Sequence, residues 1–140
     1  MTNFDIEQLM KHEPNFQGCF MRTDKLPEQG SFILNLDESD GPGTHWTAVD
    51  FDKKLYYDSY GLIWPKELNK LKLRSFNEVQ HQKGNSSLCG LYCVCVIRML
   101  NRGIGFYEIC HTLFKSCTLY KTNHAKLRTL LSKMQEAYSN

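Results

Sequence analysis

The sequence has no apolar run long enough to cross a membrane. The longest such run, from Leu88 to Ile97, contains ten residues, about half of the roughly 20 that a membrane-spanning helix needs. The N-terminus also lacks the charged and apolar segments of a secretory signal. We therefore expect a protein that has no membrane partner.

Zinc-binding cysteine pairs are also missing. The chain has six cysteines, but their spacing does not match the paired CxxC motifs of structural zinc sites. Four of the six lie in apolar, helix-like sequence, where an unpaired cysteine behaves as a small apolar residue. We therefore expect free thiols, no bound metal or other cofactor, and a reducing environment. The six are Cys19, Cys89, Cys93, Cys95, Cys110 and Cys117.

Net charge is low, at +2, which is too small to indicate nucleic-acid binding by itself. Acidic residues are nevertheless absent from Lys115 to Lys133, where five lysines or arginines occur. Two interpretations of this basic stretch remain open. It is either a solvated helix face or a surface for an anionic partner such as DNA.

The pattern of apolar and polar residues favours one α+β domain spanning residues 1–140. This length suits a single core, and no repeat, linker or low-complexity segment divides the chain. Hydrophobic periodicity predicts strands over residues 31–36, 45–51, 55–58 and 73–80. It predicts helices over residues 3–11, 65–72, 89–101, 106–114 and 123–138, and an irregular region with Pro14, Gly18, Pro27 and Gly30.

Cys89 is the candidate nucleophile. It begins the predicted helix 89–101, which carries a single charge, Arg98, and should therefore be buried nearly all round. Ser86 or Ser87 is the expected N-cap. A thiol attacks only as the thiolate, and the unpaired N–H groups and dipole of a helix N-terminus favour that negative charge.

A predicted hairpin supplies the two other groups of a cysteine nucleophile site. Its turn, Asp52-Lys53-Lys54, lies roughly midway between His45 and Asp58, so antiparallel pairing is expected to place these two residues opposite one another. Asp50 and Asp52 lie at the far end. His45 is then the candidate general base, and Asp58 orients its ring and stabilises the imidazolium.

Gln82 is the candidate donor to an oxyanion. A side-chain amide in the loop before the nucleophile can act together with the backbone N–H of Cys89. Gly90 has no side chain, which leaves room for a peptide beside the sulfur. Gln80 is a rival for the role of Gln82.

Each of these residues also has a purely structural interpretation. Cys89 can be a packing residue, as we expect for Cys93 and Cys95. Asp58 can simply open a turn. Trp46 is either a core residue or a shield that keeps water from His45. Catalysis is favoured by the conjunction of all the groups in the order that one mechanism needs. His81, His111 and His124 lack such a setting, so His81 is a second-choice base, and His111 and His124 are expected to be structural.

These motifs resemble those of a known family. Gly43-Thr44-His45-Trp46, Tyr57-Asp58-Ser59-Tyr60-Gly61 and the segment from Gln82 to Cys93 are similar to adenain-type and ubiquitin-like-protein-specific cysteine proteases. The last segment is closest to the adenoviral maturation protease. Asp-Ser-Tyr-Gly resembles the acidic element of proteases from large DNA viruses, virophages and related transposons.

The resemblance implies a papain-like α+β core, in which the nucleophile helix packs against a mixed sheet. It implies catalytic His45, Asp58 and Cys89, with Gln82 in the oxyanion hole. It also implies cleavage after small residues, often glycine, in viral capsid or core precursor proteins, inside the virion and the host cell. The cleft in such proteases is narrow, and we predict that Gly43, Trp46 and Gly90 line it.

The chain departs from adenain in ways that concern activation and substrate. It is shorter, and residues 67–81 contain no cysteine for a disulfide-linked activating peptide. Covalent activation of that kind is therefore not expected. An activating peptide held in another way remains open as a partner, and the basic stretch from Lys115 to Lys133 keeps DNA open as well. Three other functions also remain open: release of a ubiquitin-like modifier, acetyl transfer, and partner binding by an inactive homologue. Acetyl transfer is disfavoured because no basic pocket for a phosphate-bearing cofactor is evident.

Overall fold

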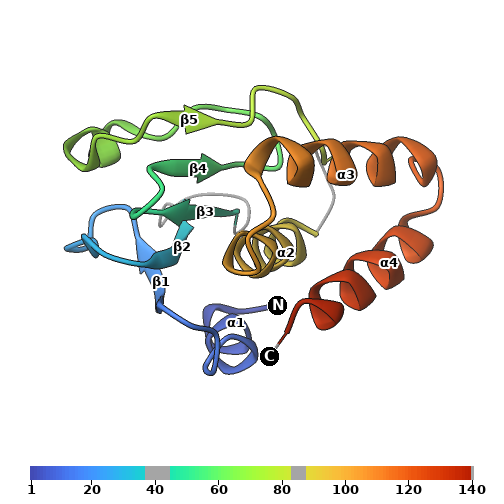
Figure 1. Cartoon of the computed structure of the whole chain (residues 1–140), viewed down its shortest axis with the longest axis horizontal. Coiled ribbons are helices and arrows are strands. Elements are labelled where there is room, and N and C mark those ends of the chain that lie inside the picture. Colours follow the sequence, from blue (N-terminus) through green and yellow to red (C-terminus); the bar gives the residue numbers. More distant parts are fainter. Residues whose placement is uncertain (37–44, 83–87, 140) are drawn as a thin grey trace.

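The computed structural model describes residues 1–36, 45–82 and 88–139. Its centre is a mixed five-stranded sheet whose strands follow one another in chain order (Figure 1). The two outer pairs are parallel and the two inner pairs antiparallel, which together with the helices makes an α+β fold. The strands are β1 (Phe16–Met21), β2 (Ser31–Asn35), β3 (Trp46–Asp50), β4 (Leu55–Tyr57) and β5 (Ser75–Phe76).

One helix occupies the middle of the molecule. In Figure 1, α2 lies between the sheet and α4, and it contacts β3, α3 and α4. Among the described residues, no helix is both long and apolar enough to cross a membrane. The helices are α1 (Asn3–Leu9), the 3-10 helix η1 (Lys66–Leu71), α2 (Cys89–Asn101), α3 (Phe106–Leu119) and α4 (His124–Ala137).

Both faces of the sheet are covered by other parts of the chain. Successive residues of a strand point to opposite faces, so β2, β3 and β4 each contribute side chains to both packed clusters. All residues of β2 and β3 are buried. One set packs with α2 and includes Ile33, Ala48 and Tyr57. The other packs around Leu68 and Leu71 of η1 and includes Phe32, Val49 and Tyr56. The hairpin of β3 and β4 is therefore fixed from both sides.

The predicted burial of the helix that begins at Cys89 is confirmed. All residues of α2 from Cys89 to Leu100 are buried, including Arg98. The N-cap is Leu88, which makes no side-chain capping hydrogen bond, while Ser86 and Ser87 lie outside the described residues. A helix end without a side-chain cap keeps its N–H groups available to other partners.

The prediction of an irregular region between Pro14 and Gly30 is wrong for residues 16–21, which form β1. This strand is only partly buried, and its pairing with β2 shifts between Phe16 and Cys19. Gly18 lies at the shift with a φ of 116°, a conformation that favours glycine. The glycine that indicated a loop therefore marks an irregularity within an edge strand.

Among the other elements, three show the clearest differences in length or type. The strand expected over residues 73–80 pairs only at Ser75–Phe76, and the helix expected over residues 65–72 is the 3-10 helix η1. Helix α3 continues past the predicted residue 114 to Leu119. The short β5 leaves most of the following segment in a loop that reaches the candidate site.

A buried ion pair anchors the C-terminal half of α2. The Arg98 Nε donates to Glu13 Oε1 at 3.1 Å, and Nη2 donates to the Leu9 carbonyl at 2.9 Å. Nη1 donates to both the backbone and the side-chain oxygen of Gln135. Asn101 Nδ2 donates to the second oxygen of Glu13 at 2.8 Å. This cluster joins α2 to α4 and to the end of α1.

Arg98→Ala is expected to lower the free energy of unfolding by about 3–5 kcal/mol, because it leaves the Glu13 carboxylate buried without its main partner. Arg102→Ala is the matched control, since Arg102 is more exposed and lies 3.6 Å from Glu13. It should lower the free energy by about 1 kcal/mol or less. Urea unfolding measures both, and equal losses would contradict the role given to Arg98.

Candidate active site

The hairpin brings His45 and Asp58 into contact. His45 immediately precedes β3 and Asp58 immediately follows β4, and Nε2 of the ring lies 2.8 Å from Oδ1 of the carboxylate. The Asp58 side chain is 2% exposed and the His45 side chain 20%. The carboxylate is thus sealed, while the imidazole reaches solvent, as a group that meets a substrate must.

The predicted register of this hairpin is wrong by two residues. Ala48 pairs with Tyr57, and continuing this pairing would set Thr47 opposite Asp58 and His45 opposite Tyr60. His45 and Asp58 are therefore not the direct cross-strand partners that the sequence predicts. They lie just beyond the last paired residues of the hairpin and contact each other diagonally. A two-residue shift keeps both side chains on the same face of the sheet, so the ring and the carboxylate still meet.

Cys89 completes the row from a different element. It is the first residue of α2, and its side chain hydrogen-bonds the ring of His45. Because Nε2 of that ring is engaged by Asp58, Nδ1 is the nitrogen that remains for the sulfur. The backbone N–H groups of Trp46 and Gly90 also hydrogen-bond the sulfur. The sulfur, the imidazole and the carboxylate, drawn from three segments, thus form one hydrogen-bonded row.

These contacts shift both pKa values in the direction of an ion pair. Burial by itself would raise the pKa of the Cys89 thiol, but the His45 ring and the two N–H groups outweigh burial and lower it. Burial would also lower the pKa of His45, yet the hydrogen bonds to Asp58 and Cys89 raise it to about 9. Both shifts favour the charged pair, a thiolate beside an imidazolium, over the neutral pair.

Alkylation of Cys89 by iodoacetamide should therefore be faster at pH 6–7 than that of an ordinary thiol, which has a pKa of about 8.5 and is mostly protonated there. Any turnover should rise as Cys89 ionises and fall above about pH 9, because His45 then loses its proton. Alkylation and turnover rates measured from pH 4 to 10 test both the rise of activity with Cys89 ionisation and its decline when His45 loses its proton. An alkylation rate that rises only near pH 8.5 would argue against the ion pair.

Two residues that the sequence analysis did not single out hold Asp58. Asn77 Oδ1 accepts from the Asp58 backbone N–H at 2.9 Å, and Asn77 Nδ2 donates to the Asp58 carbonyl at 2.5 Å. The backbone N–H of Tyr60 donates to Asp58 Oδ1 at 2.8 Å. Only the Asp-Ser-Tyr-Gly spacing pointed to this local bond, whereas Asn77 gave no signal.

An aromatic ring does lie beside His45, but it is Tyr60 and not Trp46. The rings of Tyr60 and His45 stack with centroids 4.4 Å apart. The Trp46 indole is buried in the core, and its N–H donates to Asn3 Oδ1 at 2.7 Å. Tyr60, rather than Trp46, is thus the ring placed to shield His45 from water. Trp46 instead contacts the Cys89 sulfur through its backbone N–H.

Gln82 is buried, and its side-chain oxygen accepts from the hydroxyl of Ser59. Its backbone N–H donates to the Ser59 carbonyl at 2.9 Å. The rival Gln80 is exposed, and its side chain donates to the Gln82 carbonyl at 2.6 Å. The two glutamines thus differ in setting. The Gln82 side chain is buried, whereas Gln80 lies at the surface and hydrogen-bonds the Gln82 backbone.

The two glycines predicted to line a cleft have different outcomes. A Cβ on Gly90 would lie 2.8 Å from Met1 Sδ and near Trp46 and Ile6, so that side of Gly90 is filled by protein. Its backbone N–H meets the sulfur of Cys89. Gly43 lies outside the described residues. Contact of either glycine with a substrate stays a prediction.

The remaining candidates lie apart from the row. His81 is buried, hydrogen-bonds the Tyr57 hydroxyl through Nδ1 at 2.8 Å, and has a pKa lowered to about 4 by burial. It is therefore neutral near pH 7 and a poor second choice for the base. His111 and His124 are exposed on α3 and α4. Cys93 and Cys95 are buried in the core, as expected.

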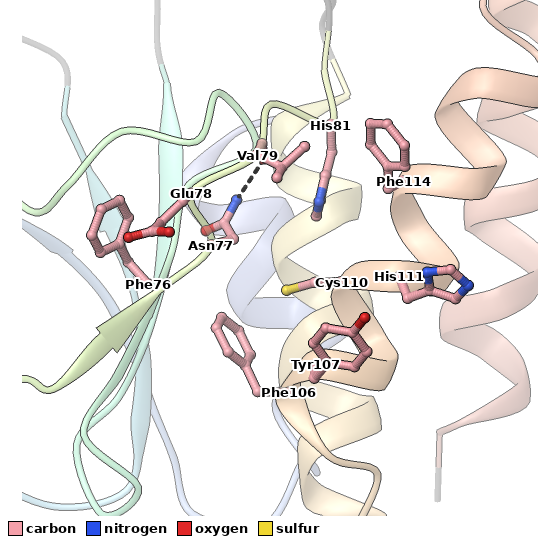
Figure 2. Close-up of a pocket in the computed structure, with 10 residues that line it drawn as sticks. All are labelled: Phe76, Asn77, Glu78, Val79, His81, Phe106, Tyr107, Cys110, His111 and Phe114. Atoms are coloured by element: carbon pink, nitrogen blue, oxygen red, sulfur yellow. Dashed lines mark hydrogen bonds between the residues drawn. The ribbon is translucent and has the colours of Figure 1, made fainter.

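One cavity of the molecule lies close to these elements but has a different lining. A volume of about 440 Å³ lies between α3 and the segment after β5, where Phe76, Val79 and His81 face Phe106 and Phe114 (Figure 2). None of His45, Asp58 and Cys89 lines it. The row of His45, Asp58 and Cys89 is therefore not part of this pocket.

No metal site competes with this interpretation in the part of the chain that the structure describes, which contains no cluster of three or more potential metal ligands. All six cysteines lie in that part, and none forms a disulfide. The five basic residues of the stretch from Lys115 to Lys133 are exposed, and an anionic partner for them stays a prediction. The chain matches no protein-family model, and no curated protein matches it.

Proposed function

We propose that this chain is a cysteine endopeptidase. The observation that carries the proposal is the row of Cys89, His45 and Asp58, in which the thiol has a lowered pKa and the imidazole a raised one. A structural cysteine needs neither a charged partner nor N–H groups directed at its sulfur. A nucleophile in acyl transfer needs both.

In the proposed mechanism, the Cys89 thiolate attacks the carbonyl carbon of a peptide bond. The negative charge that develops on the carbonyl oxygen is met by the backbone N–H of Cys89 and the side-chain amide of Gln82. Protonated His45 gives its proton to the leaving amine, and an acyl-enzyme forms. Neutral His45 then takes a proton from water, which attacks the thioester and releases the acid. Asp58 keeps the ring oriented through both halves.

The substrate follows from the motifs that resemble adenain-type proteases. We assign to this chain the same papain-like core, a cleft suited to small residues such as glycine, and viral capsid or core precursors as substrates. Two structural features are compatible with the assignment. The nucleophile begins a buried helix that packs against a mixed sheet, and the His-Trp and Asp-Ser-Tyr-Gly motifs meet at the same end of one hairpin.

Mass spectrometry of virion proteins tests the substrate. Virions made with the wild-type chain should contain capsid or core proteins with new termini after small residues, and virions made with Cys89→Ala should contain only the uncut precursors. Identical termini in both would refute the proposal. Cleavage of modifier-linked probes, with no change in virion proteins, would instead identify a deconjugating protease built on the same row.

A further inference from the structure

Two loops beside the nucleophile are joined along their backbones. The first, here the acidic loop, comprises residues 58–61, and the second, the glutamine segment, comprises residues 77–82. The Ser59 carbonyl accepts from the N–H groups of His81 at 2.7 Å and Gln82 at 2.9 Å. Asn77 bonds both backbone groups of Asp58. These bonds do not depend on the Ser59 side chain.

Gly61 shows how closely the two loops approach. Its φ is 75°, and a Cβ there would lie 2.8 Å from the carbonyl carbon of Val79 and 2.9 Å from the nitrogen of Gln80. A side chain at this position would collide with backbone, which cannot move aside cheaply. Glycine is therefore needed for the acidic loop to reach the glutamine segment at all.

Within this contact, one hydrogen bond joins two side chains. The Ser59 hydroxyl donates to Oε1 of Gln82, and the two residues are 0% and 2% exposed. Water therefore does not compete for either group. An amide has an acceptor end and a donor end. Fixing Oε1 against the hydroxyl also fixes the direction of Nε2, the end that an oxyanion requires.

We propose that Ser59 is a positioning residue that sets the orientation of the Gln82 amide for the oxyanion of the acyl-transfer step. The inference rests on the proposed function, and it makes the acidic loop serve two parts of the reaction. Asp58 orients the base, and the next residue along the chain orients the oxyanion donor. Ser59 itself does not touch the substrate.

Two reactions of the same sulfur separate this role from a merely structural one. Acylation by N-acetylglycine p-nitrophenyl ester passes through an oxyanion. Alkylation by iodoacetamide displaces iodide at a saturated carbon and forms none. Ser59→Ala should slow acylation by about five- to tenfold, as for the loss of one neutral hydrogen bond, and leave alkylation within about twofold. In a Gln82→Ala background, Ser59→Ala should have no further effect on acylation.

Ser31→Ala is the matched control, because Ser31 is a buried serine in β2 whose hydroxyl has no hydrogen-bond partner. It should change neither rate. Equal slowing of acylation and alkylation by Ser59→Ala, or no slowing of either, would overturn the inference alone. So would a full further loss in the Gln82→Ala background. A wild-type chain that is alkylated but never acylated would overturn the proposed function, and this inference with it.

Discussion

Cys89→Ala should abolish turnover while the chain stays folded. Removing the nucleophile of a comparable hydrolytic triad lowers kcat by roughly 10⁶-fold, since neither His45 nor Asp58 can take its place. The sulfur is small and lies at the start of α2, so its loss removes little of the core that holds the helix. Cleavage of a glycine-containing precursor, measured beside circular dichroism of the same sample, tests the expectation.

Cys93→Ala is the matched control for this change. Cys93 lies one turn further along α2, where its thiol donates to the Trp46 carbonyl at 3.3 Å, and burial raises its pKa well above the ordinary range. It is therefore an un-ionised packing residue. Its loss should destabilise the fold by about 1 kcal/mol and leave turnover nearly intact. Full activity in Cys89→Ala, or its absence in Cys93→Ala, would contradict the assignment of the nucleophile.

Asp58→Ala should lower turnover by roughly 10³- to 10⁴-fold, as removal of the acid does in comparable triads. The change leaves Nε2 of His45 and the N–H of Tyr60 without their shared acceptor. It also removes a charge that raises the pKa of His45. The decline of activity on the alkaline side should therefore move below pH 9, which a pH profile of the residual activity would detect.

Asp58→Asn should also lower turnover strongly, by roughly 10⁴-fold, because the amide carries no charge and favours the wrong tautomer of the His45 ring. The control is Asp50→Asn. Asp50 is buried at the opposite end of the same hairpin and accepts from the Lys53 backbone at 2.9 Å. Its substitution should change turnover by no more than about twofold, as for a residue outside the machinery. A larger loss of turnover in Asp50→Asn than in Asp58→Asn would contradict the catalytic role given to the contact between His45 and Asp58.

Parts of this architecture were predictable because their signals are local. The single charge in residues 89–101 predicted a buried helix, and α2 has the predicted bounds. The turn at Asp52-Lys53-Lys54 between two apolar runs predicted the hairpin. The pairing of His45 with Asp58 was found through a register that proved wrong by two residues, because a shift of two preserves the face of each side chain.

Other parts could not be predicted because they depend on contacts between distant segments. Strand β1 forms because β2 is beside it, although Gly18 and the flanking prolines indicated a loop. The contacts of Asn77 with Asp58 and of Ser59 with Gln82 join residues nineteen and twenty-three positions apart. No local pattern records such pairs. The packing of Met1 against Gly90 is of the same kind.

Within the row, His45 and Asp58 belong to the hairpin, whereas Cys89 belongs to α2. This difference matters for a chain that is still folding during synthesis. His45 and Asp58 are thirteen positions apart and meet through a local turn, so this half can assemble early. Cys89 follows η1, β5 and the glutamine segment along the chain, so bringing it to His45 requires closing a longer loop and is expected to occur later. Until then its thiol lacks the partner that lowers its pKa. If the proposed function holds, a chain still being synthesised is expected to be unable to cut itself or its neighbours, because activity would arise only late in folding.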